Sequence, residues 1–267
     1  MQTIKVSLCG NDFTVQVDSG VEYFTKNWRD WERGASELTL FQFIADHSDQ
    51  NGVFMDIGAW VGCATLAAAP YYQTVYTFEA DPAALVDLRA NIALNNLGNI
   101  QIRPNFVGDS EKTIPMYSMG TKNSSGSSMY HKGGHHSWDV EMIKLDSFIQ
   151  KAVAETVPLV IKMDIEGAEY ICGHLLSNVA QTGQLRALCL SLHPALLGKS
   201  VSGNGVLNKV RRRWKVFTRT LQLYPMLRVF PKIHNSDGVK VPRRRLLWAV
   251  LRHGQYLPAD RELYFTR

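Results

Sequence analysis

The feature that most constrains the fold is an alternation of short apolar segments with segments of helical periodicity between residues 53 and 193. We predict that the apolar segments are strands, at 53–56, 74–80, 100–107, 157–164 and 185–193. We predict that helices lie between them, at 62–69, 82–96 and 167–180. Strands that are apolar nearly throughout need cover on both faces, so the pattern predicts an α/β fold with a doubly wound, mostly parallel sheet between helices.

The N-terminal segment adds elements of a different kind. Residues 3–9 and 12–18 alternate apolar with polar side chains and are joined at Gly-Asn-Asp, which predicts a β-hairpin. Residues 35–47 carry apolar side chains at helical spacing. We therefore divide the chain into an N-terminal hairpin and helix, 1–50, that pack on the core, and an α/β domain, 51–267.

Two further segments interrupt the α/β pattern. Residues 108–140 form an insertion rich in glycine, serine and histidine, and a loop of that length is either functional or disordered. For the histidine-rich stretch 131–136 we favour an exposed lid over a metal cluster. Beyond His193 we predict a helix at 205–214, a strand at 215–219 and a last strand in the terminal Arg-Glu-Leu-Tyr-Phe-Thr-Arg.

Charge is distributed unevenly along the chain. Residues 199–267 hold 16 of the 29 lysines and arginines but only 3 of the 24 acidic residues. This basic C-terminal extension is either a solvated surface or a face that concentrates anions. The four cysteines are scattered, which favours reduced thiols. There is no apolar run of membrane-spanning length and no signal-peptide pattern at the N-terminus, so we expect a cytoplasmic protein.

The ends of the first two apolar strands indicate a cofactor site. In a parallel sheet, ligands bind outside the carboxyl ends of the strands. The first strand ends at Asp56 and is followed by Gly58, Ala59 and Gly62, and the second ends at Glu79. A carboxylate before the glycines opposes a pyrophosphate and favours a cationic ligand, while Glu79 is placed to accept hydrogen bonds from ribose hydroxyls. These features fit S-adenosylmethionine, and Ala80, beside Glu79, belongs to the same predicted site.

Three later strand ends carry further polar side chains. Asp109 either accepts a hydrogen bond from adenine or is a simple turn aspartate. Lys162, Asp164 and Glu166 end the fourth strand and His193 ends the fifth, and we predict these four as the catalytic set. We also expect Asp164 to bind the cofactor, beside its reactive end. We expect Glu166 to open the following helix and Glu169 to be an acidic residue of its first turn. His193 is suited to remove a proton, or, with Asp164, to bind a divalent metal such as Mg²⁺ or Mn²⁺.

Taken together, these motifs resemble the FkbM-type family of methyltransferases. The matching stretches, in chain order, are FMDIGAWVG, TFEADP, ANIALNN, VGD, NSSGSSM, IKMDIEGAEY and LSLHP. The resemblance covers residues 53 to 194 approximately, and IKMDIEGAE is its most specific motif. It implies a class I, Rossmann-like fold with a seven-stranded sheet, binding of S-adenosylmethionine, and usually O-methylation of sugar or polyketide hydroxyls. It also implies that Asp56, Gly58 and Glu79 occupy cofactor positions.

The resemblance and the residues together lead to a primary hypothesis and several alternatives. The primary hypothesis is methylation of a hydroxyl on a sugar in a glycan, nucleotide-sugar or glycolipid, with the basic extension holding a phosphate-bearing acceptor. A second is methylation of RNA, because the basic stretch KVRRRWKVF interleaves aromatic residues. A polyketide or other small-molecule acceptor, and a binding protein without catalysis, remain open. Docking of residues 205–230 on an anionic membrane surface is compatible with the primary hypothesis.

Overall fold

The computed structural model gives the placement of most of the chain. The residues it describes are 2–18, 22–118, 126–130, 136–201, 203, 205–253 and 262–267. Within these residues, none of the helices combines the length and the apolar character needed to cross a bilayer. Of the histidine-rich stretch 131–136, only His136 is described, and the expected lid lies outside the described residues.

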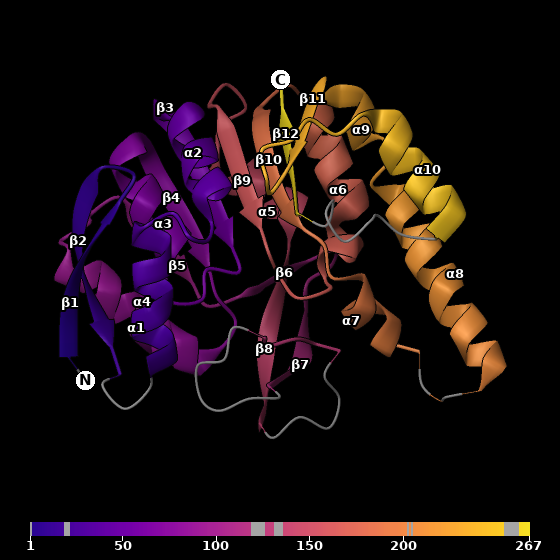
Figure 1. The fold of residues 1–267 in the computed structure, drawn as a ribbon, viewed down its shortest axis with the longest axis horizontal. Coiled ribbons are helices and arrows are strands. Elements are labelled where there is room, and N and C mark those ends of the chain that lie inside the picture. The colour runs from indigo at the N-terminus through magenta and orange to yellow at the C-terminus, as the bar shows by residue number, and fades with distance from the viewer. Residues whose placement is uncertain are drawn as a thin grey trace.

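The core of the molecule is a seven-stranded sheet in the order β11-β12-β10-β9-β3-β4-β5 (Figure 1). Its strands are β3 (Asp49–Ile57), β4 (Tyr72–Phe78), β5 (Ile100–Arg103), β9 (Leu159–Met163), β10 (Leu185–Ser191), β11 (Lys232–Asn235) and β12 (Glu262–Thr266). The pairings from β10 to β5 are all parallel, and β12 runs antiparallel to both of its neighbours. The predicted mostly parallel sheet is therefore confirmed.

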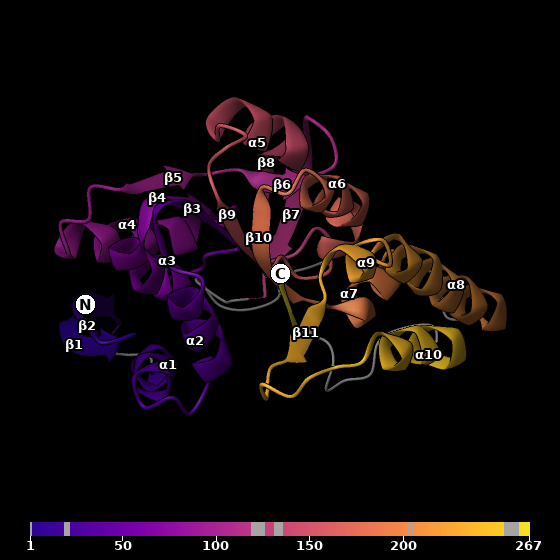
Figure 2. The same cartoon turned by 90° about the horizontal axis from the view of Figure 1, so that it is seen from above.

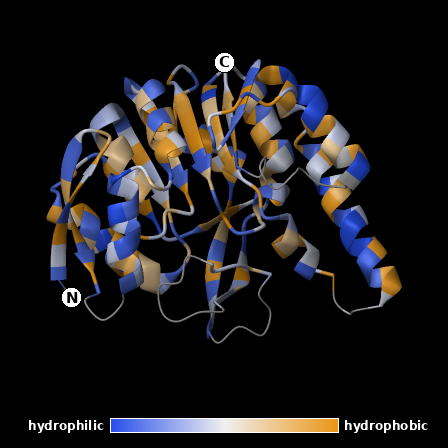
Figure 3. Cartoon of the chain, viewed as in Figure 1, coloured by the Kyte–Doolittle hydropathy of each residue, from blue (hydrophilic) through white to orange (hydrophobic). Residues whose placement is uncertain are grey.

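Helices cover both faces of this sheet (Figure 2). They are α1 (Glu22–Glu32), α2 (Leu38–Asp46), α3 (Cys63–Ala68), the 3₁₀ turn η1 (Ala69–Tyr71), α4 (Pro82–Leu94), α5 (Leu145–Ala152), α6 (Glu169–Gln181), α7 (Pro194–Lys199), α8 (Val206–Gln222), α9 (Met226–Val229) and α10 (Arg243–His253). Successive strand residues point to opposite faces. Phe54 packs with α1 to α4 on one face, whereas Met55 packs with α5 and α6 on the other. Both faces of the central strands are thus hydrophobic, as Figure 3 shows.

The predicted N-terminal hairpin is present and packs on the core. It consists of β1 (Gln2–Leu8) and β2 (Asn11–Val17), joined by Cys9 and Gly10. Both turn residues have left-handed backbones, with φ values of 52° and 75°, which suits the twist of a two-residue hairpin. Asn95 in the turn after α4 accepts a hydrogen bond from the Thr14 amide at 2.8 Å and donates one to its carbonyl.

One predicted strand is wrong in part and another is wrong entirely. The segment 100–107 divides at Pro104, which lacks an amide hydrogen, and its second half is β6 (Phe106–Gly108). With β7 (Lys112–Ser118) and β8 (His136–Lys144), β6 forms a separate three-stranded sheet beyond the carboxyl ends of the main strands (Figure 1). Much of the described part of the insertion 108–140 is therefore strand. Residues 215–219 are helical within α8, because the short apolar pattern there continues the periodicity of the preceding turns.

Candidate active site

A cavity of about 380 Å³ lies at the carboxyl ends of β3, β4 and β9. Its wall includes Gly58, Ala59 and Trp60 from the turn after β3, and Glu79 and Ala80 from the end of β4. It also includes Lys162, Asp164 and Glu166 from the end of β9. The strand order reverses between β3 and β9, since β4 and β5 extend to one side and β10 to the other. The cavity therefore occupies the switch point at which open α/β sheets bind ligands.

Gly58 is required by the protein's own backbone. Its φ is 84°, and a Cβ atom added there would lie 1.8 Å from the carbonyl oxygen of Asp164. Gly62, with φ 94°, stands at the start of α3, where a Cβ would meet Leu88 at 2.6 Å. Gly58 lines the cavity and Gly62 does not. The two glycines thus allow β3 to approach β9 and the start of α3 to approach α4.

The structure corrects the role predicted for Asp56. This side chain has no exposed surface and does not line the cavity. Its carboxylate accepts a hydrogen bond from the Thr65 hydroxyl at 2.6 Å and lies 3.2 Å from the Lys162 ammonium. The positive partner of Asp56 is therefore Lys162 on the adjacent strand, so direct selection of a cationic ligand by Asp56 does not fit this geometry.

Lys162 connects the buried Asp56 to the cavity wall. Its ammonium donates a hydrogen bond to the Gly58 carbonyl at 2.6 Å. Burial by itself lowers the pKa of this ammonium, but the negative charges of Asp56 and Asp164 outweigh burial, so the pKa of Lys162 is raised. The lysine stays charged and fixed. Its place among the predicted catalytic residues is better described as positioning the glycine turn.

Glu79 is held with its carboxylate at the cavity wall. One oxygen accepts the Trp60 amide hydrogen at 2.7 Å and the other accepts the Asp81 amide hydrogen at 2.8 Å. Burial raises the pKa of Glu79 to about 7, although these backbone hydrogen bonds favour its charged form. Asp81 is the N-cap of α4, because its side chain accepts from the Ala83 amide. The turn after β4 is therefore rigid, and it presents Glu79 where the sequence predicted a ribose-binding carboxylate.

Asp109 does not lie in the cavity wall. Its carboxylate accepts a hydrogen bond from the neighbouring Ser110 hydroxyl at 3.1 Å, as a turn aspartate does. The wall at this end is instead formed by Asn105, Phe106 and Val107. Of the two roles predicted for Asp109, the turn aspartate is the one that fits, because Asp109 follows β6 in a separate sheet and is absent from the cavity wall.

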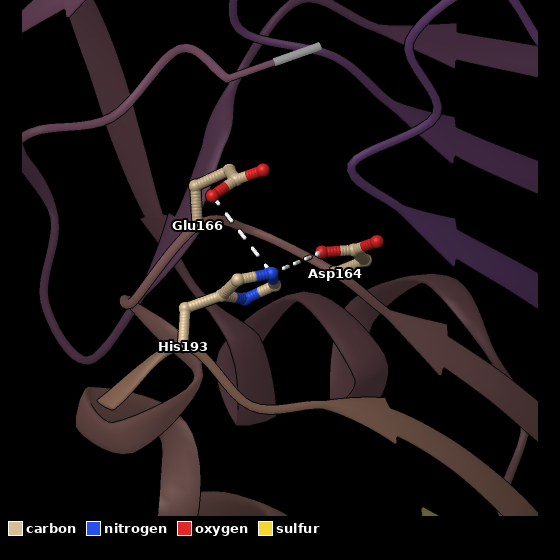
Figure 4. A group of neighbouring side chains, drawn as sticks. All are labelled: Asp164, Glu166 and His193. Atoms are coloured by element: carbon tan, nitrogen blue, oxygen red, sulfur yellow. Dashed lines mark ion pairs between the residues drawn. The ribbon is translucent and has the colours of Figure 1, made fainter. Parts of the chain in front are cut away.

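At the other end of the cavity, Asp164 and Glu166 converge with His193 (Figure 4). The His193 Nε2 atom lies 3.7 Å from Asp164 Oδ1 and 3.8 Å from Glu166 Oε2. The Asp164 oxygen is buried and makes no hydrogen bond with the described residues. One ligand atom from each of the three residues falls within 4.8 Å of the others. The three side chains thus offer a set of neighbouring atoms, two carboxylate oxygens and one imidazole nitrogen, that could bind a metal ion beside the cavity.

Glu169 is the important residue that the sequence interpretation missed. It is fully buried, and its carboxylate lies 2.9 Å from His193 Nδ1. The same carboxylate accepts the amide hydrogens of Ile165 and Gly167. Glu169 therefore fixes both the His193 ring and the turn after β9. The prediction gave it only the role of an acidic residue in the first turn of the helix. Glu169 is the last residue of the motif IKMDIEGAE, and this position in the sequence could have indicated its importance.

The charge around His193 determines its protonation. Burial by itself lowers the pKa of the imidazole, but the hydrogen bond to Glu169 and the charges of Glu169, Asp164 and Glu166 outweigh it. The pKa of His193 is raised to about 9 as a result. Without a further cation, the imidazole is protonated at neutral pH and is a poor base.

The prediction that Glu166 opens the following helix is wrong. It has a left-handed backbone with φ 52°, it precedes Gly167 with φ 97°, and α6 begins three residues later at Glu169. The Ser128 hydroxyl donates to the Glu166 carbonyl at 2.7 Å and helps to fix this turn. The turn directs the Glu166 side chain toward His193. Burial raises the pKa of Glu166 to about 7, and the nearby imidazole partly offsets that effect.

The N-terminal helices supply a further wall that the sequence interpretation did not assign. Tyr23, Asn27 and Trp31 of α1 and Glu37 at the start of α2 line the cavity opposite the sheet. The Trp60 ring lies 6.1 Å from the Tyr23 ring and 5.9 Å from the Trp31 ring, centroid to centroid. Phe24, Trp28 and Trp31 are spaced by four and three residues, and this helical spacing could have predicted α1 from the sequence. These helices give the cavity a partly aromatic, partly acidic rim.

The fold and the site together define a class of protein. The order of the central sheet, its antiparallel β12 and the carboxylate at the end of β4 are those of a class I, S-adenosylmethionine-dependent methyltransferase. Residues 52–172 match the model of the methyltransferase FkbM domain. This match confirms, over residues 52–172, the resemblance to the FkbM family that the motifs predicted.

Solved structures with similar folds include three that differ widely from this chain in sequence. SMU.1697c of Streptococcus mutans, in complex with SAH, is 15% identical, with 64% of this chain and 77% of that chain covered and a TM-score of 0.35. A SAM-dependent methyltransferase from Agrobacterium tumefaciens is 13% identical, with 71% and 52% covered and a TM-score of 0.38. Precorrin 8w decarboxylase from Methanobacterium thermoautotrophicum is 14% identical, with 86% and 88% covered and a TM-score of 0.34. No curated protein matches the chain.

Proposed function

We propose that this methyltransferase transfers the methyl group to a hydroxyl of a sugar, in a glycan, nucleotide-sugar or glycolipid, with the help of a divalent cation. The observation that carries the proposal is the convergence of Asp164, Glu166 and His193 at one end of the cofactor cavity. A hydroxyl must lose its proton as it accepts a methyl group, and this cluster is the part of the site suited to that task.

The cavity fits S-adenosylmethionine. This cofactor supplies a methyl group activated by a sulfonium. Glu79, fixed by two backbone amides, offers its remaining acceptor sites to ribose hydroxyls. Among the described residues of the cavity wall, several side chains are acidic and Lys162 is the basic one. The charge of Lys162 is already paired with Asp56. The cavity therefore favours a ligand that carries positive charge.

The cluster fits a small divalent cation. Carboxylates are ligands for Mg²⁺ and Mn²⁺, and a neutral imidazole can complete the site for a transition ion such as Mn²⁺. The Asp164 oxygen lacks a hydrogen-bond partner among the described residues. Glu169 would hold the Nδ1 hydrogen of His193 and keep Nε2 available, as the carboxylate behind a metal-binding histidine does. A cation held there would lower the pKa of a hydroxyl bound to it. Three carboxylates around one imidazole leave the site with negative charge to neutralise.

The rim of the cavity supports a sugar as acceptor. Tyr23 is 51% exposed, and with Trp60 it forms an aromatic surface on which the apolar face of a sugar ring can pack. Asn27 and Glu37 line the same wall and offer hydrogen-bonding groups for hydroxyls. The basic helices α8 and α10 contribute no residue to the wall. A phosphate on the acceptor would accordingly lie outside the cavity.

The proposal is tested in two stages. Titration calorimetry should show S-adenosylmethionine binding that is strongly weakened in Glu79→Ala, and Mn²⁺ binding, followed by electron paramagnetic resonance, that is lost in Asp164→Asn. Asp146→Asn, a half-buried carboxylate of α5 away from the cavity, is the matched control. Transfer is then measured on sugar, RNA and polyketide acceptors, with and without a chelator.

Each outcome has a distinct meaning. Transfer to sugars that a chelator abolishes supports the whole proposal. Transfer that is indifferent to the chelator would exclude the cation, and transfer only to RNA or to polyketides would exclude the sugar. Cofactor binding without transfer to any acceptor would indicate a binding protein.

A further inference from the structure

Helix α8 presents an apolar stripe to solvent. Leu207, Val210 and Trp214 are 75%, 59% and 65% exposed. Their spacing of three and four residues places them on one side of the helix. The opposite side is the one that packs on the protein, where Val216 and Thr220 are buried. The helix therefore has two apolar faces, and the second faces away from the core.

Basic side chains border this stripe on both sides. At 100° per residue, Arg211 and Lys215 fall along one edge of the stripe, and Arg213 falls along the other. Helix α8 contains no acidic residue. An apolar stripe flanked by positive charge is typical of a helix that lies in a membrane interface.

Helix α10 lies beside α8 and carries the same two kinds of exposed side chain. It packs against α8, and the two helices run side by side along one edge of the molecule in both Figure 1 and Figure 2. Trp248 is 49% exposed and Leu251 is 66% exposed. Arg244 and Arg252 are exposed beside them, and α10, like α8, has no acidic residue. Figure 3 shows the mixture of hydrophobic and hydrophilic residues along both helices.

We propose that α8 and α10 dock this protein on a bilayer that contains anionic phospholipid. The basic side chains would be attracted to the anionic membrane surface, and the apolar stripe would be buried at the boundary between headgroups and acyl chains. RNA would satisfy the charges but would leave Leu207 and Val210 in water, because these side chains cannot stack on bases as an aromatic ring does. Charge and apolar exposure together therefore favour a lipid surface.

The placement of α8 suits this role. The helix begins at the end of the molecule toward which the carboxyl ends of β3 and β9 point (Figure 1). The most exposed apolar residues are in its first turns, so the docking surface and the cavity are at the same end of the protein. The inference goes beyond the proposed function and does not depend on the identity of the acceptor.

The test is co-sedimentation of the whole protein with vesicles of phosphatidylcholine, with and without phosphatidylglycerol. We expect binding only to the anionic vesicles, weakened by salt. Leu207→Ser with Trp214→Ser, and separately Arg211→Gln with Arg213→Gln, should each weaken binding by about tenfold or more. Val86→Ser with Arg89→Gln is the matched control on α4, where Val86 is 58% exposed, and it should bind as the parent does.

Several results would overturn the proposal. These are equal binding to neutral vesicles, no binding to anionic vesicles, or loss of binding in the α4 control as large as in the α8 variants. Retention of a single-stranded RNA with no retention of vesicles would identify the surface as a nucleic-acid site instead. Titration of S-adenosylmethionine and thermal unfolding of every variant show that the fold and the cofactor site are intact, so a failure here is distinct from a failure of the proposed function.

Discussion

The carboxylate of Glu169 holds the imidazole of His193 through a contact of 2.9 Å between Oε1 and Nδ1. The two residues are 24 positions apart in the chain. Glu169 is fully buried, whereas His193 lies beside Asp164 and Glu166, which line the cavity. Because Nδ1 is occupied, Nε2 is the nitrogen that faces Asp164 and Glu166. This contact sets the direction in which His193 can act.

The first prediction concerns this contact. Glu169→Gln should lower kcat and Mn²⁺ affinity by about 10- to 100-fold, because the partner behind a metal-binding histidine fixes its orientation and basicity. The affinity for S-adenosylmethionine should change little, since Glu79 lies at the other end of the cavity. Glu169→Asp should recover part of the Mn²⁺ affinity. A variant with normal kcat and normal Mn²⁺ affinity would show that the contact is only structural.

The second prediction concerns Gly58. Gly58→Ala should destabilise the fold by about 3 kcal/mol or more, because its new methyl group would overlap the Asp164 carbonyl as well as strain the backbone. Gly183→Ala is the matched control, since Gly183 has nearly the same φ, 85°, but has nothing within 4 Å of the added Cβ. That variant should cost only about 1–2 kcal/mol. Equal losses in urea unfolding would mean that the close approach to Asp164 is unimportant.

The third prediction concerns the buried pair of Asp56 and Lys162. Lys162→Met removes the cation that faces Asp56 and should destabilise the protein by about 3–5 kcal/mol. Adding Asp56→Asn to that variant should restore part of the loss, since the uncompensated charge is then gone. The free energies of unfolding of the two single variants and the double variant form a double-mutant cycle. Additive losses would contradict a direct interaction.

The fourth prediction is a pH dependence that arises from Glu79, whose pKa is raised to about 7 by burial. Ribose hydroxyls donate best to the charged carboxylate, so the affinity for S-adenosylmethionine should rise as the pH rises through about 7. The stability of the cofactor-free protein should change in the opposite direction. The native state binds this proton more tightly than the unfolded state does, so the free energy of unfolding falls between the ordinary glutamate pKa and 7.

Glu79→Gln is the control for this pH dependence. It keeps the shape of the side chain but cannot titrate, so its affinity curve should be flatter than that of the parent protein between about pH 6 and 8. Calorimetric titrations at several pH values give the comparison. An identical pH profile in both proteins would assign the dependence to another group.

The sequence by itself determined the architecture and the location of the site. Strands that are apolar on both faces require a sheet covered by helices, and the ends of parallel strands gather at one edge. Glu79, Asp164 and Glu166 could therefore be placed in one cavity wall, with His193 beside them, from their positions at or just after strand ends. The architecture can be predicted in this way because the spacing of apolar residues within a strand or helix indicates which of its faces are buried.

Only the tertiary structure decided which polar groups are partners and which are free. The register of β3 against β9 places Asp56 opposite Lys162 and so removes Asp56 from the ligand. The turn after β9 and the end of β10 bring Glu169 to His193, and α1 brings Tyr23 over the cavity. A buried charge is tolerated only where a partner compensates it, and that partner often comes from a distant part of the chain. Such pairings are set by packing between elements, which no local pattern in the sequence records.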